Sequence, residues 1–443
     1  MGPEQPVHSA HLDLDRSPRL DSKRHTKYFL RCLKTYLPHP YTSNDSNRLS
    51  LAFFIIAALD VLDQLDETTT PQERADYINW VYSNQHPDGG FRGFPGSDLG
   101  PLRNPDNAGW DPAHVPGTYF ALCLLLILDD DFERLDRKKC LEWLVQMQRE
   151  DGSFGETLFD GTVQGGRDSR FGYCAAGVRY ILAGPSPKPG QADINVDKLV
   201  DCIRLAESYD GGISDAPFHE SHAGLTFCGL SALSLLGRLS SSLRYPSESS
   251  KHNSSFPTGP SDPEATVRWL VSRQTATISD DDGFDTKCDE TDTPETCHDA
   301  HTFVGPNHHP TAAGQMSLDA KPSLSFDIQW TGMNGRCNKV ADTCYAFWAG
   351  ASLKILNHSS LPHELSLRKW LLERTAHSAL GGFGKIAGDL PDVYHSYLAL
   401  AVLSMMNMKE DGLVPLDPTM CISTRAKDRL RPLWERWGVL GTS

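Results

Sequence analysis

Apolar residues along this chain form long runs separated by amphipathic and polar segments. A first helix is expected from Arg24 to Leu37, where large apolar side chains recur at helical spacing. The next, from Leu49 to Leu65, follows a capping Asn44-Asp45-Ser46 and is apolar nearly all round, which is typical of a buried helix. Further apolar helices are expected at residues 118–128, 173–182, 224–236, 345–356 and 395–406.

Short glycine turns recur between these runs. Each turn follows a helix and precedes a connector and an apolar helix, and repeats of this length indicate an array architecture. Two helices per unit, one apolar and one amphipathic, predict a closed α/α barrel with inner and outer rings. No sustained period-two alternation is present, so the expected fold class is all-α. The turns are Asp88-Gly89-Gly90-Phe91, Asp151-Gly152-Ser153-Phe154, Asp210-Gly211-Gly212-Ile213, Asp282-Gly283-Phe284 and Gly381-Gly382-Phe383.

Composition divides the chain into one domain and three polar segments. Residues 1–22 are expected to be a disordered tail, and residues 23–443 a single domain. Two stretches interrupt the repeat, a Ser- and Pro-rich one at 240–264 and an Asp-, Thr-, His- and Pro-rich one at 275–327. Neither has apolar residues enough to bury a helix face, so both are predicted to be mobile surface insertions. One last helix is expected at 424–437.

Charge and cysteine usage limit the classes of partner and compartment. The chain has 42 basic and 57 acidic residues, and its net charge of −15 argues against nucleic acid as a partner. The 11 cysteines are scattered, many inside apolar runs, which is typical of reduced thiols in a cytoplasmic protein. The longest apolar run, residues 119–128, is too short to cross a bilayer, and no secretory signal is recognisable.

The densest chemistry lies around Asp342 and Cys344. Residues two apart point to different faces inside a helix, so these two side chains can share an ion only at a helix entrance, where Asp is a favoured cap. A thiolate and a carboxylate suit zinc, and His395, in the first turn of another apolar helix, is the candidate third ligand. The alternative is a capping Asp, a buried Cys and a satisfied core His.

The stretch Gly335-Arg336-Cys337-Asn338-Lys339-Val340-Ala341-Asp342-Thr343-Cys344-Tyr345-Ala346-Phe347-Trp348 resembles the zinc and diphosphate segment of protein prenyltransferase β subunits. The resemblance extends from about Arg24 to about Trp437. Among these β subunits, the chain resembles the type I geranylgeranyltransferases most. Two stretches carry that resemblance: Asn47-Arg48-Leu49-Ser50-Leu51-Ala52-Phe53-Phe54 and Ile422-Ser423-Thr424-Arg425. The fold that it implies is an α-α toroid.

The family's reaction joins an isoprenoid to a cysteine thiol and expels diphosphate. The resemblance implies transfer from geranylgeranyl diphosphate to C-terminal Cys-a-a-Leu (CaaX) sequences of proteins such as small GTPases. It also implies one zinc ion held by Asp342, Cys344 and His395, and an obligate heterodimer with a helical-repeat α subunit. No nucleic acid and no membrane insertion are expected.

The resemblance assigns the diphosphate to His222, Arg336, Lys339 and Tyr345, each of which can donate a hydrogen bond to oxygen. Lys385 stands where farnesyltransferases have an aspartate that uses magnesium, so magnesium is not expected to be required. Tyr345 and Lys385 thus join the three metal ligands as catalytic candidates. For Arg336 and Lys339 the alternative is a solvated loop, and for His222 a helix cap.

The resemblance also assigns the lipid and peptide pockets. Trp348, Phe53, Phe54 and Tyr173 are candidates for the lipid wall, with ordinary core packing as the alternative. Ser50 replaces a tryptophan that closes the pocket floor in farnesyltransferases, which leaves room for a fourth isoprene. The peptide substrate is expected to contact Arg170, His114 and Phe171. Tyr394 and Leu398 depart from the mammalian pattern, which has Leu and Phe there.

Rival interpretations concern both motifs and function. Asp281-Asp282-Gly283-Phe284-Asp285 imitates the magnesium motif of isoprenoid synthases, and a Cys- and His-rich stretch imitates a zinc knuckle; both are interpreted as incidental. The alternatives for function are a farnesyltransferase or Rab-type geranylgeranyltransferase β subunit, a terpene cyclase-like barrel, or a non-catalytic helical scaffold. The zinc-knuckle candidates are Cys288, Cys297, His298, His301, His308 and His309.

Overall fold

The structure is a computed structural model of the 443-residue chain. It describes residues 18–35, 37, 41, 43–185, 187–239, 259–276 and 329–439. Residues 1–17 of the expected tail, the cores of both expected insertions and the two incidental motifs between 281 and 309 lie outside the described residues.

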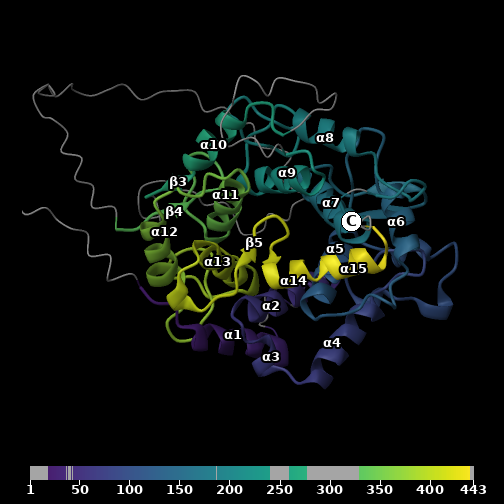
Figure 1. The fold of residues 1–443 in the computed structure, drawn as a ribbon, viewed down its shortest axis with the longest axis horizontal. Helices are drawn as coiled ribbons and strands as arrows, with labels where there is room; N and C mark the ends of the chain where they lie inside the picture. The colour runs from purple at the N-terminus through teal and green to yellow at the C-terminus, as the bar shows by residue number, and fades with distance from the viewer. Residues whose placement is uncertain are drawn as a thin grey trace, which may run out of the picture.

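Within the described residues, six apolar helices form a closed inner ring (Figure 1). Their contacts run in chain order and return from the last helix to the first, which closes the barrel. Because each helix touches an inner neighbour on both sides and the core at its centre, it is buried nearly all round. They are α2 (Arg48–Val61), α5 (Val115–Ile127), α7 (Ser169–Ala183), α9 (Ala223–Leu235), α11 (Thr343–Ile355) and α13 (Val393–Met406).

A second set of helices covers the outside of the ring (Figure 1). Each outer helix follows its cap residue and buries one face, as its amphipathic pattern predicts. Thr70 and Glu73 form a reciprocal capping box at the start of one of them, with Pro71 as its first residue. The outer helices are α1 (Ser22–Lys34), α4 (Pro71–Ser83), α6 (Arg137–Gln146), α8 (Val196–Leu205), α10 (Pro263–Val271) and α12 (Glu364–Trp370).

A bridged turn after each of five outer helices leads the chain back to the inner ring. In three of these turns the backbone N–H of the apolar residue donates to a hydroxyl in the first turn of the next inner helix, at 2.8 Å. These pairs are Phe91 with Thr118, Ile213 with Thr226, and Phe383 with Ser396. The bridges are Gln85–Phe91, Gln148–Phe154, Glu207–Ile213, Gln274–Met333 and Ala376–Phe383.

The fourth bridge is formed by residues far apart in the chain. β3 (Gln274–Thr275) pairs with β4 (Gly332–Met333) at this place in the repeat, while the expected turn at Asp282-Gly283-Phe284 lies outside the described residues. The buried side chain of Met333 takes the position that Phe91 and Phe383 have in their turns. A long connection inside one hairpin hides the repeat from a search for short spacings.

A C-terminal hairpin reaches into the barrel. The hairpin consists of β5 (Leu416–Asp417) and β6 (Ile422–Ser423), and the carbonyls of its tip accept hydrogen bonds from tyrosines of three inner helices. Tyr119 donates to Met420 over 2.7 Å, Tyr173 to Thr419 over 3.0 Å, and Tyr397 to Cys421 over 2.5 Å. The hydroxyls satisfy carbonyls that would otherwise be buried without partners.

Short elements complete the described fold. The all-α toroid prediction is confirmed, since within these residues the strands have two or three residues each. The expected helix at 424–437 is two helices, which lie across the ring in Figure 1. None of the helices in the described ranges combines the length and apolar composition that a membrane crossing requires. The remaining elements are α3 (Leu65–Thr68), α14 (Thr424–Asp428), α15 (Leu430–Arg436), β1 (Thr157–Phe159) and β2 (Thr162–Gln164).

Several predicted boundaries were wrong. Residues 18–22 were assigned to the tail, but Pro18 accepts a hydrogen bond from Arg368 over 2.8 Å and α1 begins at Ser22. The first insertion was expected to run to residue 264, whereas Asp262 already caps α10. Thr275, expected at the start of the second insertion, lies in β3. Asn44-Asp45-Ser46 makes no side-chain cap for α2, because a 3₁₀ turn precedes that helix.

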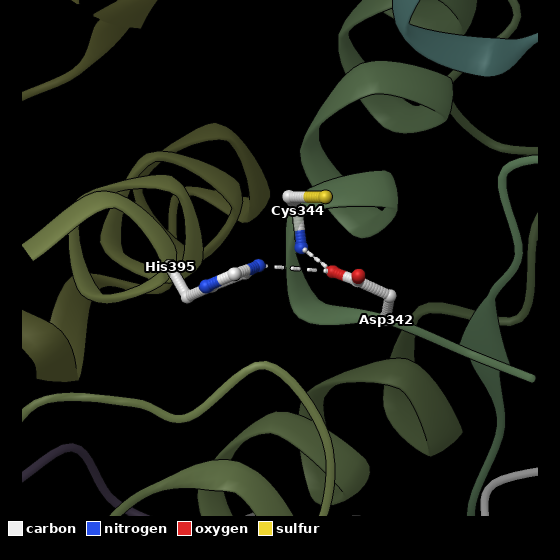
Figure 2. A group of neighbouring side chains, drawn as sticks. All are labelled: Asp342, Cys344 and His395. Atoms are coloured by element: carbon white, nitrogen blue, oxygen red, sulfur yellow. Dashed lines mark hydrogen bonds and ion pairs between the residues drawn. The ribbon is translucent and has the colours of Figure 1, made fainter. Parts of the chain in front are cut away.

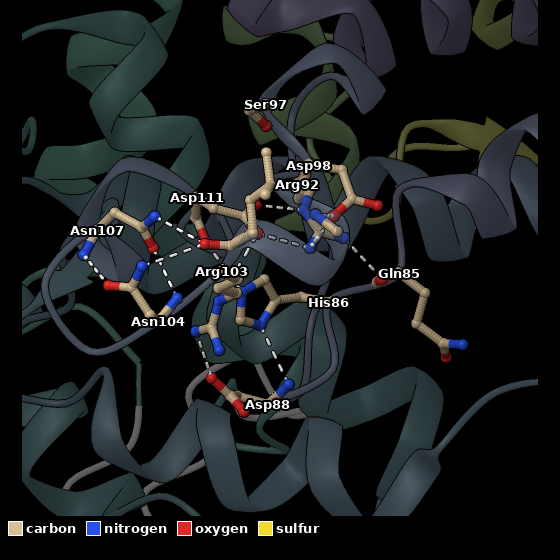
Figure 3. A network of polar contacts seen from close by, with 12 residues as sticks. Gln85, His86, Asp88, Arg92, Ser97, Asp98, Arg103, Asn104, Asn107 and Asp111 are labelled. Atoms are coloured by element: carbon tan, nitrogen blue, oxygen red, sulfur yellow. Dashed lines mark hydrogen bonds and ion pairs between the residues drawn. The ribbon is translucent and has the colours of Figure 1, made fainter.

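A buried ion pair braces the loop that leads into α5 (Figure 3). The Arg92 guanidinium donates to both carboxylate oxygens of Asp111, and it also donates to Asp98 over 3.0 Å. Arg92 is 1% exposed and Asp111 is 0% exposed. Buried charges are tolerated only when they are paired and hydrogen-bonded, so this network fixes the loop immediately before His114.

Candidate active site

The first residues of the inner helices gather at one mouth of the barrel. At the start of α5, the backbone N–H of Val115 donates to the carbonyl of Glu156, in the segment before α7, over 2.9 Å. At the start of α11, the backbone N–H of Thr343 donates in the same way to the carbonyl of Lys385, in the segment before α13, over 2.9 Å. Because neighbouring helices begin side by side, cap residues far apart in sequence lie close in space. The caps are His114, Asp168, His222, Asp342 and Asp392.

Asp342, Cys344 and His395 meet at this mouth (Figure 2). One ligand atom from each lies within 4.8 Å of the others, and no other such group occurs in the part of the chain that the structure describes. Asp342 caps α11 by accepting from the backbone N–H of Cys344 over 2.8 Å, and its Oδ1 lies 3.3 Å from Nε2 of His395. Asp342 and Cys344 are each 6% exposed.

Asp392 orients the imidazole of His395. The cap accepts from the backbone N–H of His395 over 2.8 Å and from its Nδ1 over 2.6 Å. Since Nδ1 is occupied by a carboxylate, Nε2 is the nitrogen that faces Asp342 and Cys344. Burial lowers the pKa of His395, but the hydrogen bonds with Asp342 and Asp392 raise it more, to about 9.

The donor set fits a zinc ion. Burial and the neighbouring Asp342 raise the pKa of the Cys344 thiol well above its ordinary value, so a thiolate here needs a cation beside it. Burial opposes ionisation of Asp342 too, but the hydrogen bond with His395 keeps the pKa of this carboxyl below its usual range. Nitrogen, sulfur and oxygen donors, with an imidazole held by a carboxylate, are typical of zinc sites.

A second polar pair lies beside the metal ligands. His222 caps α9, and its Nδ1 accepts from the backbone N–H of Gly224 over 3.1 Å. Its Nε2 lies 3.0 Å from the hydroxyl of Tyr345, which follows Cys344 in sequence. A Cβ at Gly335 would overlap the ring of Tyr345, so a glycine is required there. Burial, aided by Arg336 and Arg170, lowers the pKa of His222 to about 4.

Three predicted cations lie on the loops around this pair. Arg336 is exposed, and its guanidinium lies 3.5 Å from the carboxylate of Glu220. Arg336 follows Gly335, whose carbonyl accepts from the backbone N–H of Ala223 at the start of α9. Lys339 is half-buried, and its carbonyl accepts from the side chain of Asn334. Lys385 is exposed on the loop before α13, where its charge acts on Cys344.

The aromatic candidates for the lipid wall cluster inside the mouth. The Trp348 ring lies 4.8 Å from Phe227, and Phe54 lies 5.3 Å from Tyr394. Phe53 is 1% exposed and packs on Tyr397, so it belongs to the core behind this surface. Tyr173 is buried and binds the hairpin tip.

Ser50 is half-buried in the first turn of α2. The backbone N–H of the preceding residue, Leu49, donates to the carbonyl of Gly93 in the turn before α5, so Ser50 lies near the mouth. Its role at the end of the lipid pocket stays a prediction.

The peptide candidates begin α5 and α7. The Nε2 of His114 lies 2.5 Å from Oε1 of Glu156, and Arg170 binds both oxygens of Asp168 at 2.8 and 3.0 Å. The hydrogen bond from His114, together with the charge of Arg170, keeps the pKa of Glu156 below its ordinary value despite its burial. Phe171 is buried beside Arg170.

Some contributors to the site were missed from the sequence. No sequence motif marks Glu156 as a site residue, because its partner His114 lies far away in the chain. The roles of Tyr119 and Tyr397 at the hairpin tip were not predicted, and their one signal in the sequence is a polar hydroxyl within an apolar run. Asp392, the partner of His395, was not among the predicted site residues.

Comparisons with known proteins agree with this fold. The sequence model of the prenyltransferase alpha-alpha toroid domain matches residues 20–422. The chain is 30% identical to the geranylgeranyl transferase type-1 subunit beta of Arabidopsis thaliana, over 91% of this chain and 89% of that protein. It is also 30% identical to the protein of the same name from Dictyostelium discoideum, over 92% of this chain and 96% of that protein.

A solved structure shares the fold. The Candida albicans protein geranylgeranyltransferase-I, complexed with GGPP, matches with a TM-score of 0.70 and 27% identity, over 94% of this chain and 99% of that chain. Together with the toroid of inner and outer helices, these matches show that the chain belongs to the prenyltransferase β subunits, in the family of the geranylgeranyl transferase type-1 β subunits.

Proposed function

We propose that this chain is the catalytic β subunit of a zinc-dependent protein geranylgeranyltransferase type I. The enzyme transfers a geranylgeranyl group from geranylgeranyl diphosphate to the thiol of a C-terminal Cys-a-a-Leu sequence. The observation that carries the proposal is the Asp342, Cys344 and His395 donor set beside the His222–Tyr345 pair, at one mouth of the barrel.

Asp342, Cys344 and His395 would hold the zinc ion, each through one ligand atom. Zinc held by these residues would bind the incoming thiol and lower the pKa of that thiol. Asp392 keeps Nδ1 of His395 occupied, so Nε2 is the nitrogen that would bind the ion. The burial of the site excludes water from the ligand atoms.

The residues beside the donor set stabilise the leaving diphosphate. His222 is neutral and gives its one N–H to Tyr345, so the Tyr345 hydroxyl proton is free to point at a diphosphate oxygen. Arg336, Lys339 and Lys385 supply fixed positive charge on the surrounding loops. Preorganised donors and cations of this kind act on the charge that grows on the leaving group. The fixed ammonium of Lys385 supports turnover without magnesium.

The apolar side of the mouth accommodates the lipid. Trp348 and Phe54 lie on different inner helices and face the same aromatic cluster. Each buried CH₂ of an isoprenoid chain contributes about 0.8 kcal/mol, so a long lipid is strongly favoured wherever the pocket has room for it. The small Ser50 supplies that room for a fourth isoprene.

The peptide lies across the starts of α5 and α7. His114, Phe171 and Arg170 form a surface with both an apolar and a charged part, which suits a C-terminal leucine and its carboxylate region. The α subunit of a heterodimer supplies a further cation and makes the assembly active. The free thiols of all nine described cysteines suit a cytoplasmic location, where small GTPases are the expected substrates.

Metal analysis of the heterodimer tests this function. Purified αβ enzyme is expected to contain one zinc ion, and Cys344→Ala and His395→Ala should lose both zinc and turnover while helical content persists. Cys202→Ser, which changes a half-buried cysteine on the outer helix α8, is the matched control and should retain both. Full zinc content and turnover in the Cys344 and His395 variants would refute the assignment.

A further inference from the structure

Arg273 is a buried cation behind the loop that carries Arg336 and Lys339. It lies between α10 and β3 and is 4% exposed. Its guanidinium lies over the ring of Trp269, 4.7 Å from the ring centroid, and its Nε donates to the Trp269 carbonyl over 3.2 Å. Its Nη1 has no hydrogen-bond partner, and no carboxylate of the described residues forms an ion pair with it. A buried charge without a counter-ion is costly, so this arginine needs a local reason.

The repeat itself does not require a charge at this place. Arg273 comes directly before the bridging residue of the fourth turn, and the other four described turns have uncharged residues there. The backbone contact is the same with and without the charge. The carbonyl of Arg273 accepts from the N–H of Asn334 over 2.8 Å, just as the carbonyl of Asn84 accepts from Arg92 in the first turn. The uncharged residues are Asn84, Met147, Ala206 and Thr375.

The side chain of Arg273 reaches the loop of residues 334–339, which follows β4. Its Nη2 donates to the sulfur of Cys337 over 3.2 Å. Cys337 lies directly after Arg336 and two residues before Lys339. Asn334, which bonds to the Arg273 carbonyl, also donates from its side chain to the carbonyl of Lys339 over 3.1 Å. Arg273 therefore holds the start of this loop through its backbone and the middle of the loop through its guanidinium.

We propose that Arg273 is a positioning residue for the diphosphate: it holds the loop of residues 334–339 so that Arg336 and Lys339 meet the diphosphate in one arrangement. The inference rests on the diphosphate role proposed above for these two residues. Their long side chains have many rotamers, so a fixed backbone is needed to confine their charges. A guanidinium is a rigid fork of donors, so Arg273 can hold the Trp269 carbonyl and the Cys337 sulfur at once.

Equilibrium binding of geranylgeranyl diphosphate to the αβ heterodimer tests the proposal without turnover. Arg273→Met introduces the residue that the second turn has at the same place, so the fold should tolerate it, and binding is expected to weaken about 10-fold. Cys337→Ala removes the sulfur from the exposed end of the contact and should weaken binding by a smaller factor. Arg179→Met is the matched control and should keep the affinity, because Arg179 is also buried but pairs with Asp193 beyond the first turns of α7.

A double-variant cycle gives a readout that a purely structural role would not move. Arg336→Ala should weaken binding by itself, and Arg273→Met added to it should weaken binding by less than the product of the two effects, since Arg273 acts through Arg336. If the effects multiply, or if Arg273→Met or Cys337→Ala binds like the unmodified enzyme while Arg336→Ala does not, the positioning role is wrong and the proposed function stands. If Arg336→Ala and Lys339→Ala both keep full affinity, the diphosphate assignment is refuted, and this inference with it. Cys337→Ala keeps the test decisive if Arg273→Met fails to assemble.

Discussion

The imidazole of His222 donates from Nε2 to the hydroxyl oxygen of Tyr345 over 3.0 Å, which links the first turns of α9 and α11. The direction follows from the other ring nitrogen, because Nδ1 of His222 accepts from Gly224. The pKa of His222 is lowered to about 4 by burial, with Arg336 adding to the effect, so the ring is neutral at pH 7 and has one proton to give. The Tyr345 hydroxyl is thereby held ready to donate outward.

Removing the Tyr345 hydroxyl should therefore slow the reaction. Tyr345→Phe is expected to lower kcat by about 100-fold, the usual loss for one preorganised donor to a developing negative charge. His222→Ala should lower kcat as well, and the double variant should lose less than the product of the two effects, since both act through one hydroxyl. Single-turnover kinetics measure this, and independent, multiplicative effects would contradict the link.

The His25–Gly382 contact predicts a pH-dependent stability. Nδ1 of His25 accepts from the backbone N–H of Gly382 over 3.0 Å, which joins α1 to the last repeat. Burial is the main cause that lowers the pKa of His25 from 6.5 to about 4, so between these values the unfolded chain binds a proton that the folded chain does not. This group's contribution is complete above pH 6.5 and falls by about 3 kcal/mol as the pH drops to 4.

His25→Asn keeps an acceptor for Gly382 without a titrating group. Thermal unfolding of the heterodimer between pH 7 and pH 4.5 is expected to be less steep in pH for this variant than for the unmodified enzyme. Equal slopes for the two proteins would show that His25 does not titrate in this way.

The Arg92–Asp111 pair should be far more important for stability than a surface pair. Arg92→Ala leaves the fully buried carboxylate of Asp111 without its main partner, which is expected to cost about 3–5 kcal/mol. Arg48→Ala removes a guanidinium that is 44% exposed and pairs with the exposed Asp45, and it should cost under about 1 kcal/mol. Urea unfolding of both variants compares them, and similar midpoints would contradict the role of the buried pair.

Lys385 predicts independence from magnesium. Its ammonium is a fixed charge near Cys344, where an ion-binding carboxylate would instead have to recruit a cation. Lys385→Asp should lower the rate in the absence of magnesium, and millimolar magnesium should restore part of it. The rates of both proteins are titrated against magnesium with zinc retained. Loss of turnover by the unmodified enzyme on removal of magnesium would exclude this role for Lys385.

The sequence predicted most of the inner ring because buried helices leave a continuous apolar signal. Cap residues such as Asp342 were also predictable, since an Asp before an apolar run is a local feature. Contacts between distant segments were not. Glu156 meets His114, and the hairpin tip meets Tyr119, only after the ring closes. The long connection between β3 and β4 likewise separates Gln274 from Met333, so their pairing could not be predicted from short spacings.

The central claim is transfer of a twenty-carbon lipid to a peptide thiol at the zinc site. The most direct measurement is turnover of a Cys-a-a-Leu peptide by the purified heterodimer, with geranylgeranyl and farnesyl diphosphate compared side by side, for the unmodified enzyme and for Ser50→Trp. We expect a higher kcat/KM with the geranylgeranyl donor in the unmodified enzyme and a shift toward the farnesyl donor in the variant. A preference for farnesyl diphosphate in the unmodified enzyme, or no transfer from either donor, would contradict the account.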